Sequence, residues 1–242
     1  MSVHFEQYDL SRPLDISIPL SATPDNVSAW YVSPPQFKAV EAEGWVGEVK
    51  RGGSVNFRNI LFNPHGHGTH TECVGHIAEE VHSINQCLKK FFFDALLVTV
   101  TPEKIGEDLV ITKAELAKKC LFTHHRAVVI RTLPNTNDKL HKQYSNTNPT
   151  YLDHHAAEWL RENGIKHLLI DLPSVDREVD GGKLLAHRAF WHYPEQPRMD
   201  CTITEMIYVP NEIADGEYLL NLQIAPFEND ASPSKPVLYP LK

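Results

Sequence analysis

The segment Asn63-Pro64-His65-Gly66-His67-Gly68-Thr69-His70-Thr71-Glu72-Cys73-Val74-Gly75-His76 places four histidines and a carboxylate within one short stretch. The two glycines between the histidines disfavour a stable helix and permit tight turns, so imidazoles at different spacings can converge. Imidazole and carboxylate groups are ligands of zinc, manganese and iron(II), and the absence of a cysteine pair argues against a closed structural zinc site. The segment predicts a metal centre of the kind that hydrolases use, and the alternative is a solvated histidine-rich loop.

Length and composition set the general class. The chain has 242 residues, of which 42% are hydrophobic, and we expect a single domain over residues 1–242. A net charge of -8 without a dense Lys/Arg stripe argues against nucleic acid or an anionic membrane surface as a partner. No signal peptide is evident, and no apolar run approaches about 18 residues, so we expect a cytoplasmic protein. The four scattered cysteines predict reduced thiols.

Upstream of the histidine segment, residues 8–14 and 15–20 alternate polar and apolar positions between prolines, which predicts short strands at a sheet edge. Residues 22–48 are irregular and contain Trp30, Tyr31 and Trp45. These aromatic side chains either fill core or subunit contacts, which is the more common use, or line a pocket for an aromatic substrate. Residues 55–62 are predicted to form a strand that leads into the histidine segment.

Downstream, buried strands and helices alternate. The apolar runs predict strands at 95–100, 127–130 and 165–171. Thr112 with Glu115 forms a capping box for a helix through residue 119, Thr150 and Asp153 repeat the pattern, and Gly164 can end that second helix. Residues 132–148 are polar and predict an exposed loop or a mobile lid, of which the loop is the more common. This order predicts an α/β protein whose sheet is at least partly parallel.

Three later sites offer further functional groups. Asp171, Ser174 and Asp176 follow a strand end, where they either reach the active site or hydrogen-bond the turn. His187 lies in an apolar stretch, where a single histidine is more often a core residue than a ligand. Glu205 falls in one row with the apolar residues of its predicted strand. A carboxylate there needs a metal ion, a basic partner, or a strand whose other face is the buried one.

Together these residues resemble the metal-dependent cyclase and kynurenine formamidase family, whose motif is His-x-Gly-Thr-His-x-Asp-x-Pro-x-His. Gly68-Thr69-His70, Glu72 and His76 match the core of the motif. The resemblance extends over nearly the whole chain and includes residues 8–11, 170–176, 187, 205 and 216–218. It implies a single cyclase-like swivelling β/β/α domain with a mixed sheet.

The resemblance also implies roles for individual residues. The first histidine of the motif would fall on Gly66, so a shifted loop must supply His65 or His67 instead, and we favour His65. Glu72 replaces the aspartate of the motif, and Val74 replaces its proline. The implied catalytic acid/base is His76, and the implied metal ligands are His65 or His67, His70, Glu72, His187 and Glu205.

The expected activity follows from this ligand set and from the resemblance. Zinc or manganese would lower the pKa of bound water toward about 7, and His76 would exchange protons with the leaving amine. We therefore expect a hydrolase of C–N bonds other than peptide bonds, acting on an aryl formamide such as N-formylkynurenine. The alternatives are a cyclase, a cyclic amide or lactone (isatin-type) hydrolase, and a non-catalytic metal-binding scaffold. By resemblance, the chain should form a homodimer or a higher homo-oligomer.

Overall fold

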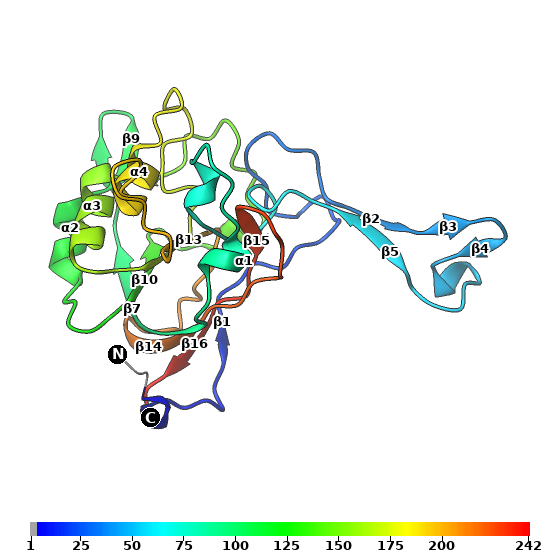
Figure 1. Ribbon diagram of the computed structural model, residues 1–242, viewed down its shortest axis with the longest axis horizontal. Helices are drawn as coiled ribbons and strands as arrows, with labels where there is room; N and C mark the ends of the chain where they lie inside the picture. Colours follow the sequence, from blue (N-terminus) through cyan, green and yellow to red (C-terminus); the bar gives the residue numbers. More distant parts are fainter. Residues whose placement is uncertain (1–3) are drawn as a thin grey trace.

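The computed structural model describes residues 4–242, and Figure 1 shows a body of sheet and helices from which a long arm projects. Within these residues, the largest sheet contains nine strands in the order β1-β16-β14-β7-β10-β12-β13-β6-β15. In chain order, these strands are β1 (Leu14–Asp15), β6 (His70–Glu72), β7 (Phe92–Val100), β10 (Ala127–Thr132), β12 (His167–Ile170), β13 (Thr202–Glu205), β14 (Gly216–Asn221), β15 (Ala231–Pro233) and β16 (Val237–Pro240).

The sheet is mixed. Strands β7, β10, β12 and β13 are parallel, whereas β14 on one side and β6 on the other pair with them antiparallel. The predicted α/β class with a mixed sheet is confirmed.

The central strands are buried on both faces. In β10, Val128 and Ile130 belong to one apolar cluster, and Ala127 and Val129 belong to the other. The first cluster lies under helices α2 (Lys113–Lys119), α3 (His154–Glu162) and α4 (Leu185–Trp191). The second includes Ile84 of the short helix α1 (Ile84–Cys87). Burial on both faces explains the uninterrupted apolar runs of these strands.

The helix ends follow the predicted signals, with one correction. Thr112 Oγ1 accepts a hydrogen bond from Glu115 N (3.3 Å) and caps α2. Asp153 Oδ1 accepts from His155 N (3.2 Å), so Asp153 rather than Thr150 caps α3. Gly164, two residues beyond α3, has a φ of 78°, which glycine adopts without the strain of a side chain.

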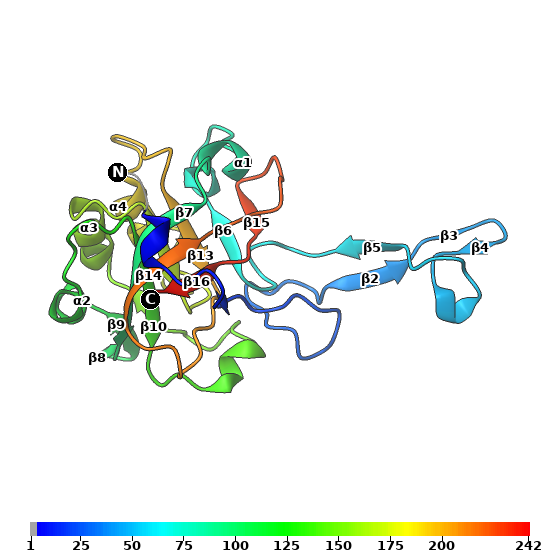
Figure 2. The same ribbon diagram turned by 90° about the horizontal axis from the view of Figure 1, so that it is seen from below.

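The arm is a long β-hairpin. Strand β2 (Gln36–Ala39) pairs with β5 (Arg58–Leu61), and the tip holds β3 (Glu41–Ala42), β4 (Trp45–Val46) and the 3-10 turn η2 (Val49–Arg51). Figures 1 and 2 both show it extending away from the body. The strand predicted at 55–62 is shorter than expected and forms one side of the arm.

The edges also differ from prediction. The two strands predicted over 8–20 reduce to β1 and single bridges at Tyr8 and Ser17, since the prolines interrupt the hydrogen-bond ladder. The stretch predicted as an exposed loop contains η4 (Asn137–Leu140) and a buried Tyr144. The remaining elements are η1 (Phe5–Gln7), η3 (Val74–His76) and a small sheet of β8 (Glu103–Ile105), β9 (Asp108–Ile111) and β11 (Tyr151–Leu152).

None of the helices formed by residues 4–242 combines the length and the apolar character needed to cross a membrane. All four cysteines are free thiols, in agreement with the prediction from their spacing.

Candidate metal centre

Strand pairing builds the centre. Strand β6 lies between β13 and β15, and its antiparallel register places His70 opposite Glu205. The 3-10 turn η3 follows β6 and ends at His76. Helix α4 contributes a further histidine. The structure thereby brings together six of the residues singled out in the sequence, which we call the central cluster: His65, His70, Glu72, His76, His187 and Glu205.

His70 and Glu205 face each other across the two strands. His70 Nδ1 donates to Gly68 O (3.0 Å), and its Nε2 lies 3.4 Å from Glu205 Oε2. Glu205 Oε1 accepts from Val175 N at 2.9 Å. The strand predicted around Glu205 ends at this residue, because Met206 has a positive φ of 51°. Glu205 therefore stands at the end of a buried strand, and the predicted row of alternate residues does not continue beyond it.

His187 is held by Asp176. The Asp176 carboxylate accepts from the backbone N–H of Ala186 (2.7 Å) and His187 (3.2 Å), and from His187 Nδ1 (2.6 Å). His187 Nε2 then lies 3.0 Å from Glu72 Oε1. The sequence left open whether the acids after β12 reach the active site or hydrogen-bond the turn. Asp176 reaches the central cluster, because it binds His187. Asp171 instead accepts hydrogen bonds from Thr132 N and Oγ1, which attach the turn after β12 to the end of β10.

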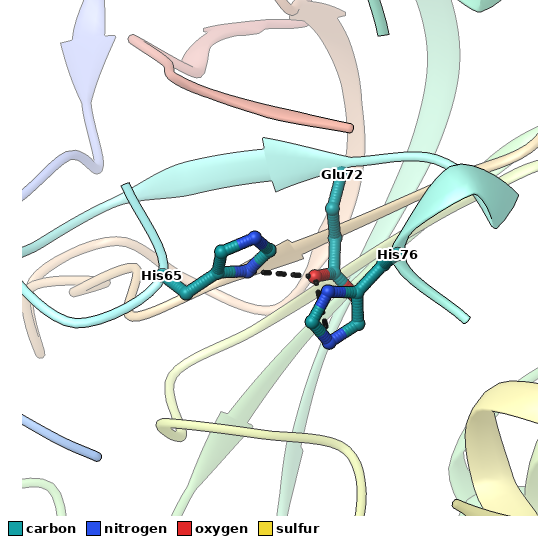
Figure 3. A group of neighbouring side chains, drawn as sticks. All are labelled: His65, Glu72 and His76. Atoms are coloured by element: carbon teal, nitrogen blue, oxygen red, sulfur yellow. Dashed lines mark ion pairs between the residues drawn. The ribbon is translucent and has the colours of Figure 1, made fainter. Parts of the chain in front are cut away.

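His65 and His76 approach the other oxygen of Glu72, and Figure 3 shows both rings pointing at its carboxylate. His65 Nδ1 lies 3.2 Å and His76 Nε2 lies 3.8 Å from Glu72 Oε2, with the two rings stacked 4.3 Å apart. Their other nitrogens meet Asp230 Oδ2, at 2.9 Å from His65 Nε2 and 3.2 Å from His76 Nδ1. Sequence reasoning missed Asp230, which lies in an Asn-Asp turn beside β15 without a motif around it.

The four imidazoles share one arrangement. Each directs one ring nitrogen to Glu72 or Glu205 and the other to an acceptor outside the cluster. Metal-binding histidines are typically oriented in this way. The outer acceptors are Gly68 O for His70, Asp176 for His187, and Asp230 for both His65 and His76.

The residues present fit a divalent cation. His70 Nε2 and Glu72 Oε2 are buried and lack a hydrogen-bond partner among residues 4–242, which is unfavourable unless a cation lies between them. Two groups of potential ligands share Glu72, and within each group the ligand atoms lie within 4.8 Å of one another. One group is His65, Glu72 and His76, and the other is His70, Glu72 and Glu205.

The carboxylates and imidazoles of the central cluster shift one another's pKa values. Burial opposes ionisation of Glu72, but the neighbouring His76, His187 and His65 outweigh it and hold its pKa well below the usual range. Burial likewise opposes protonation of His65, but Asp230 and Glu72 outweigh it and raise the pKa of His65 to about 10. The pKa of His187 is raised in the same way by Asp176 and Glu72. Glu72 and the imidazoles around it therefore favour one another's charged forms.

His67 lies outside the central cluster. Its Nδ1 accepts from Asn63 N (2.8 Å), and its Nε2 donates to Ser33 O (2.9 Å), so both ring nitrogens bind backbone. The ring supports the fold of the histidine segment. Of the two flanking candidates for the first ligand, the structure places only His65 beside Glu72.

Trp191, Trp45 and Tyr31 lie in different environments. Trp191 is fully buried, with its ring 5.3 Å from that of His187. Trp45 lies at the tip of the arm, where it packs against Phe57 at 6.2 Å. Tyr31 is exposed, and its hydroxyl donates to Glu178 at 2.9 Å.

Comparisons with known proteins extend this description. Residues 8–177 match the family model described as putative cyclase. A kynurenine formamidase from Bacillus cereus is 28% identical over 232 residues, which cover 96% of this chain and 99% of that protein. A solved structure described as a potential metal-dependent hydrolase with cyclase activity has a TM-score of 0.68 at 16% identity, over 96% of this chain and 98% of the other. An isatin hydrolase bound to the product analogue thioisatinate has a TM-score of 0.66 at 14% identity, over 95% and 92%.

Proposed function

Because the chain belongs to the putative cyclase family, we propose that it is a metal-dependent hydrolase of a small amide, with an aryl formamide such as N-formylkynurenine as its substrate. The observation that supports this most is the convergence of four imidazoles on Glu72 and Glu205. The similarity to kynurenine formamidase along the full length of both chains favours a formamide substrate.

His70, Glu72 and Glu205 would hold one divalent ion and His65 with Glu72 would hold a second, whereas His76 stays available for proton transfer. His187 adds a fourth imidazole beside Glu72. When bound, zinc or manganese makes water acidic enough to supply hydroxide near neutral pH and polarises a carbonyl group.

His76 is suited to move protons. With 29% of its side chain exposed, it is the most exposed imidazole of the central cluster, so it reaches both solvent and the acidic centre. Asp230 holds its Nδ1 and leaves Nε2 free to accept a proton from water and return it to the leaving amine. Hydrolysis of a formamide would release the aryl amine and formate.

The decisive experiment compares the wild-type protein with His76→Asn. We expect the wild type to hydrolyse N-formylkynurenine, to lose activity with EDTA and to recover it with Zn²⁺ or Mn²⁺. His76→Asn should lose turnover by about 10²-fold or more while its metal content, measured by mass spectrometry, stays unchanged. His82→Asn is the matched control, because His82 follows the histidine segment in the chain and lies outside the central cluster.

Isatin and a small lactone complete the substrate panel. Preferential hydrolysis of isatin would identify a cyclic amide hydrolase, the alternative that the similarity to isatin hydrolase suggests. Bound metal without hydrolysis of any of these compounds would favour a scaffold protein. Neither bound metal nor hydrolysis would contradict the proposal altogether.

We further propose that the chain forms a homodimer or higher homo-oligomer through its arm. Phe57, Ile60 and Leu61 of the arm are 57%, 55% and 65% exposed. Three large apolar side chains on a projecting hairpin favour contact with a second copy of the chain. Free thiols in all four cysteines are compatible with the reducing cytoplasm, which we propose as its location.

A further inference from the structure

A second group of potential metal ligands lies nearer to the β1 edge of the nine-stranded sheet than the central cluster does. His124 and His125 lie just before β10, with Arg126 between them and the strand, and Glu217 lies on β14. Strand β7 separates β14 from β10, while the central cluster lies beyond β12 on β13 and β6. Potential ligand atoms of His124, His125 and Glu217 lie within 4.8 Å of one another.

His125 is the unusual member of this group. Its side chain is nearly fully buried, and neither ring nitrogen has a hydrogen-bond partner among the residues that the structure describes. Glu217 Oε1 is 3.3 Å from His125 Nε2, close enough for an ion pair but without the direction of a hydrogen bond. A buried imidazole without a partner requires an explanation, and a cation shared with Glu217 would supply one.

The neighbouring groups suit a transition-metal ion. The His124 and His125 rings are stacked 4.5 Å apart, so both imidazoles lie beside the same carboxylate. His124 and Glu217 are exposed, so water can complete the coordination. Two imidazoles, one carboxylate and water are a ligand set typical of zinc.

We propose that His124, His125 and Glu217 bind a zinc ion, separate from the central cluster, that links the start of β10 to β14. Because these strands lie on either side of β7, the ion would brace three neighbouring strands. The site is partly open to solvent, so its zinc should exchange with the medium.

A second pair of adjacent histidines provides the matched control. His154 and His155 of α3 have rings 4.0 Å apart, and Glu158 lies 3.9 Å from His155. Both pairs thus combine neighbouring imidazoles with a carboxylate. The α3 pair, however, does not belong to any convergent group of three ligands found in residues 4–242.

The test counts zinc ions per chain in four proteins: the wild type, His124→Asn, Glu217→Gln and His154→Asn. Each is equilibrated with micromolar Zn²⁺, dialysed and analysed by mass spectrometry. We expect His124→Asn and Glu217→Gln each to lose one ion relative to the wild type, and His154→Asn to lose none. Both test substitutions are at exposed positions, so the buried His125 and the fold remain intact.

A crystal of the zinc-loaded wild type, recorded at the zinc absorption edge, locates the ion directly. Anomalous density between His125 and Glu217 is the expected result. The proposal is overturned if that density is absent, if all four proteins hold equal numbers of ions, or if the extra ion binds only at millimolar Zn²⁺. Catalytic activity is not a readout, so the result is independent of the proposed hydrolase.

Discussion

Asp230 uses a single oxygen atom to contact two imidazoles of the central cluster, those of His65 and His76. The two rings are stacked, so a change at this carboxylate should alter the orientation of both. Burial opposes the ionisation of Asp230, but His65 and His76 outweigh it and hold its pKa well below the usual range. The charge is therefore present across the physiological pH range.

Replacing Asp230 with Asn should lower kcat/KM or metal affinity by about 10- to 100-fold, as loss of an outer partner of metal-bound histidines typically does. Asparagine keeps an acceptor oxygen but carries no charge, so it should hold the two rings more weakly. Steady-state kinetics and metal titration measure the effect. Glu228→Gln, an exposed change in the same loop, is the control and should behave as the wild type. Equal kinetics and affinity in Asp230→Asn would contradict this role.

Metal removal should make the protein sensitive to high pH. The folded pKa of His65 is about 10, above its usual value of 6.5. The protonated ring therefore stabilises the metal-free protein fully below about pH 6.5, and this stabilisation is lost as the pH rises toward 10. Metal binding requires the deprotonated ring, so metal affinity should rise over the same window.

Calorimetry of Zn²⁺ binding at pH 8, in two buffers of different ionisation enthalpy, measures the protons released. We expect net release by the wild type and smaller release by Asp230→Asn, because the substitution removes the first of the groups that raise the pKa of His65. Identical heats in the two buffers would show that no proton leaves the centre.

At the scale of elements, Asp171 connects the ends of two parallel strands. It lies just after β12 and accepts from Thr132 N (2.8 Å) and Thr132 Oγ1 (2.9 Å) at the end of β10. Lys139 of η4 donates to the same carboxylate at 2.7 Å. Burial raises the pKa of Asp171, against the opposing effects of Lys139 and Thr132. Together, Asp171, Thr132 and Lys139 fix the turn after β12 that leads toward Asp176.

Asp171→Asn should therefore reduce the free energy of unfolding by about 3–5 kcal/mol, as expected when one partner of a buried ion pair is removed. An amide would direct a donor toward groups that are themselves donors. Urea denaturation followed by circular dichroism gives the value. Asp138→Asn on η4 is the control, since its carboxylate is exposed, and it should change stability by less than about 0.5 kcal/mol. A loss of similar size in both variants would refute the connecting role.

At the scale of the whole molecule, the arm projects from the body and supplies none of the residues of the central cluster. All four residues of β5 are exposed, and the hairpin extends beyond the body in both views (Figures 1 and 2). A hairpin with so little burial has few contacts of its own to stabilise it. Contact with another copy of the chain would cover its apolar residues.

Leu61→Lys should shift the protein from oligomer to monomer without lowering the stability of the body, because Leu61 is 65% exposed. Light scattering coupled to size-exclusion chromatography measures the mass. Leu121→Lys is a suitable control, since Leu121 is 80% exposed and lies on the body. A wild-type protein that is already monomeric would exclude assembly through the arm.

Local chemistry allowed much of the fold to be predicted. The apolar runs indicated β7, β10 and β12, because strands buried on both faces need no polar alternation. Thr112 and Asp153 indicated helix starts, since a side-chain cap satisfies free backbone N–H groups close in sequence. The edge strands and the arm were less predictable, because their sequences lack the apolar runs that indicate the buried central strands.

The histidine segment, together with the family motif, indicated most of the central cluster from sequence alone, because residue type determines which groups can bind a metal ion. The tertiary structure decided which of these side chains meet. Pairing of β6 with β13 sets His70 opposite Glu205, backbone contacts turn His67 away, and a distant turn supplies Asp230. These outcomes depend on strand register and loop packing between residues far apart in the chain, which local sequence patterns do not encode.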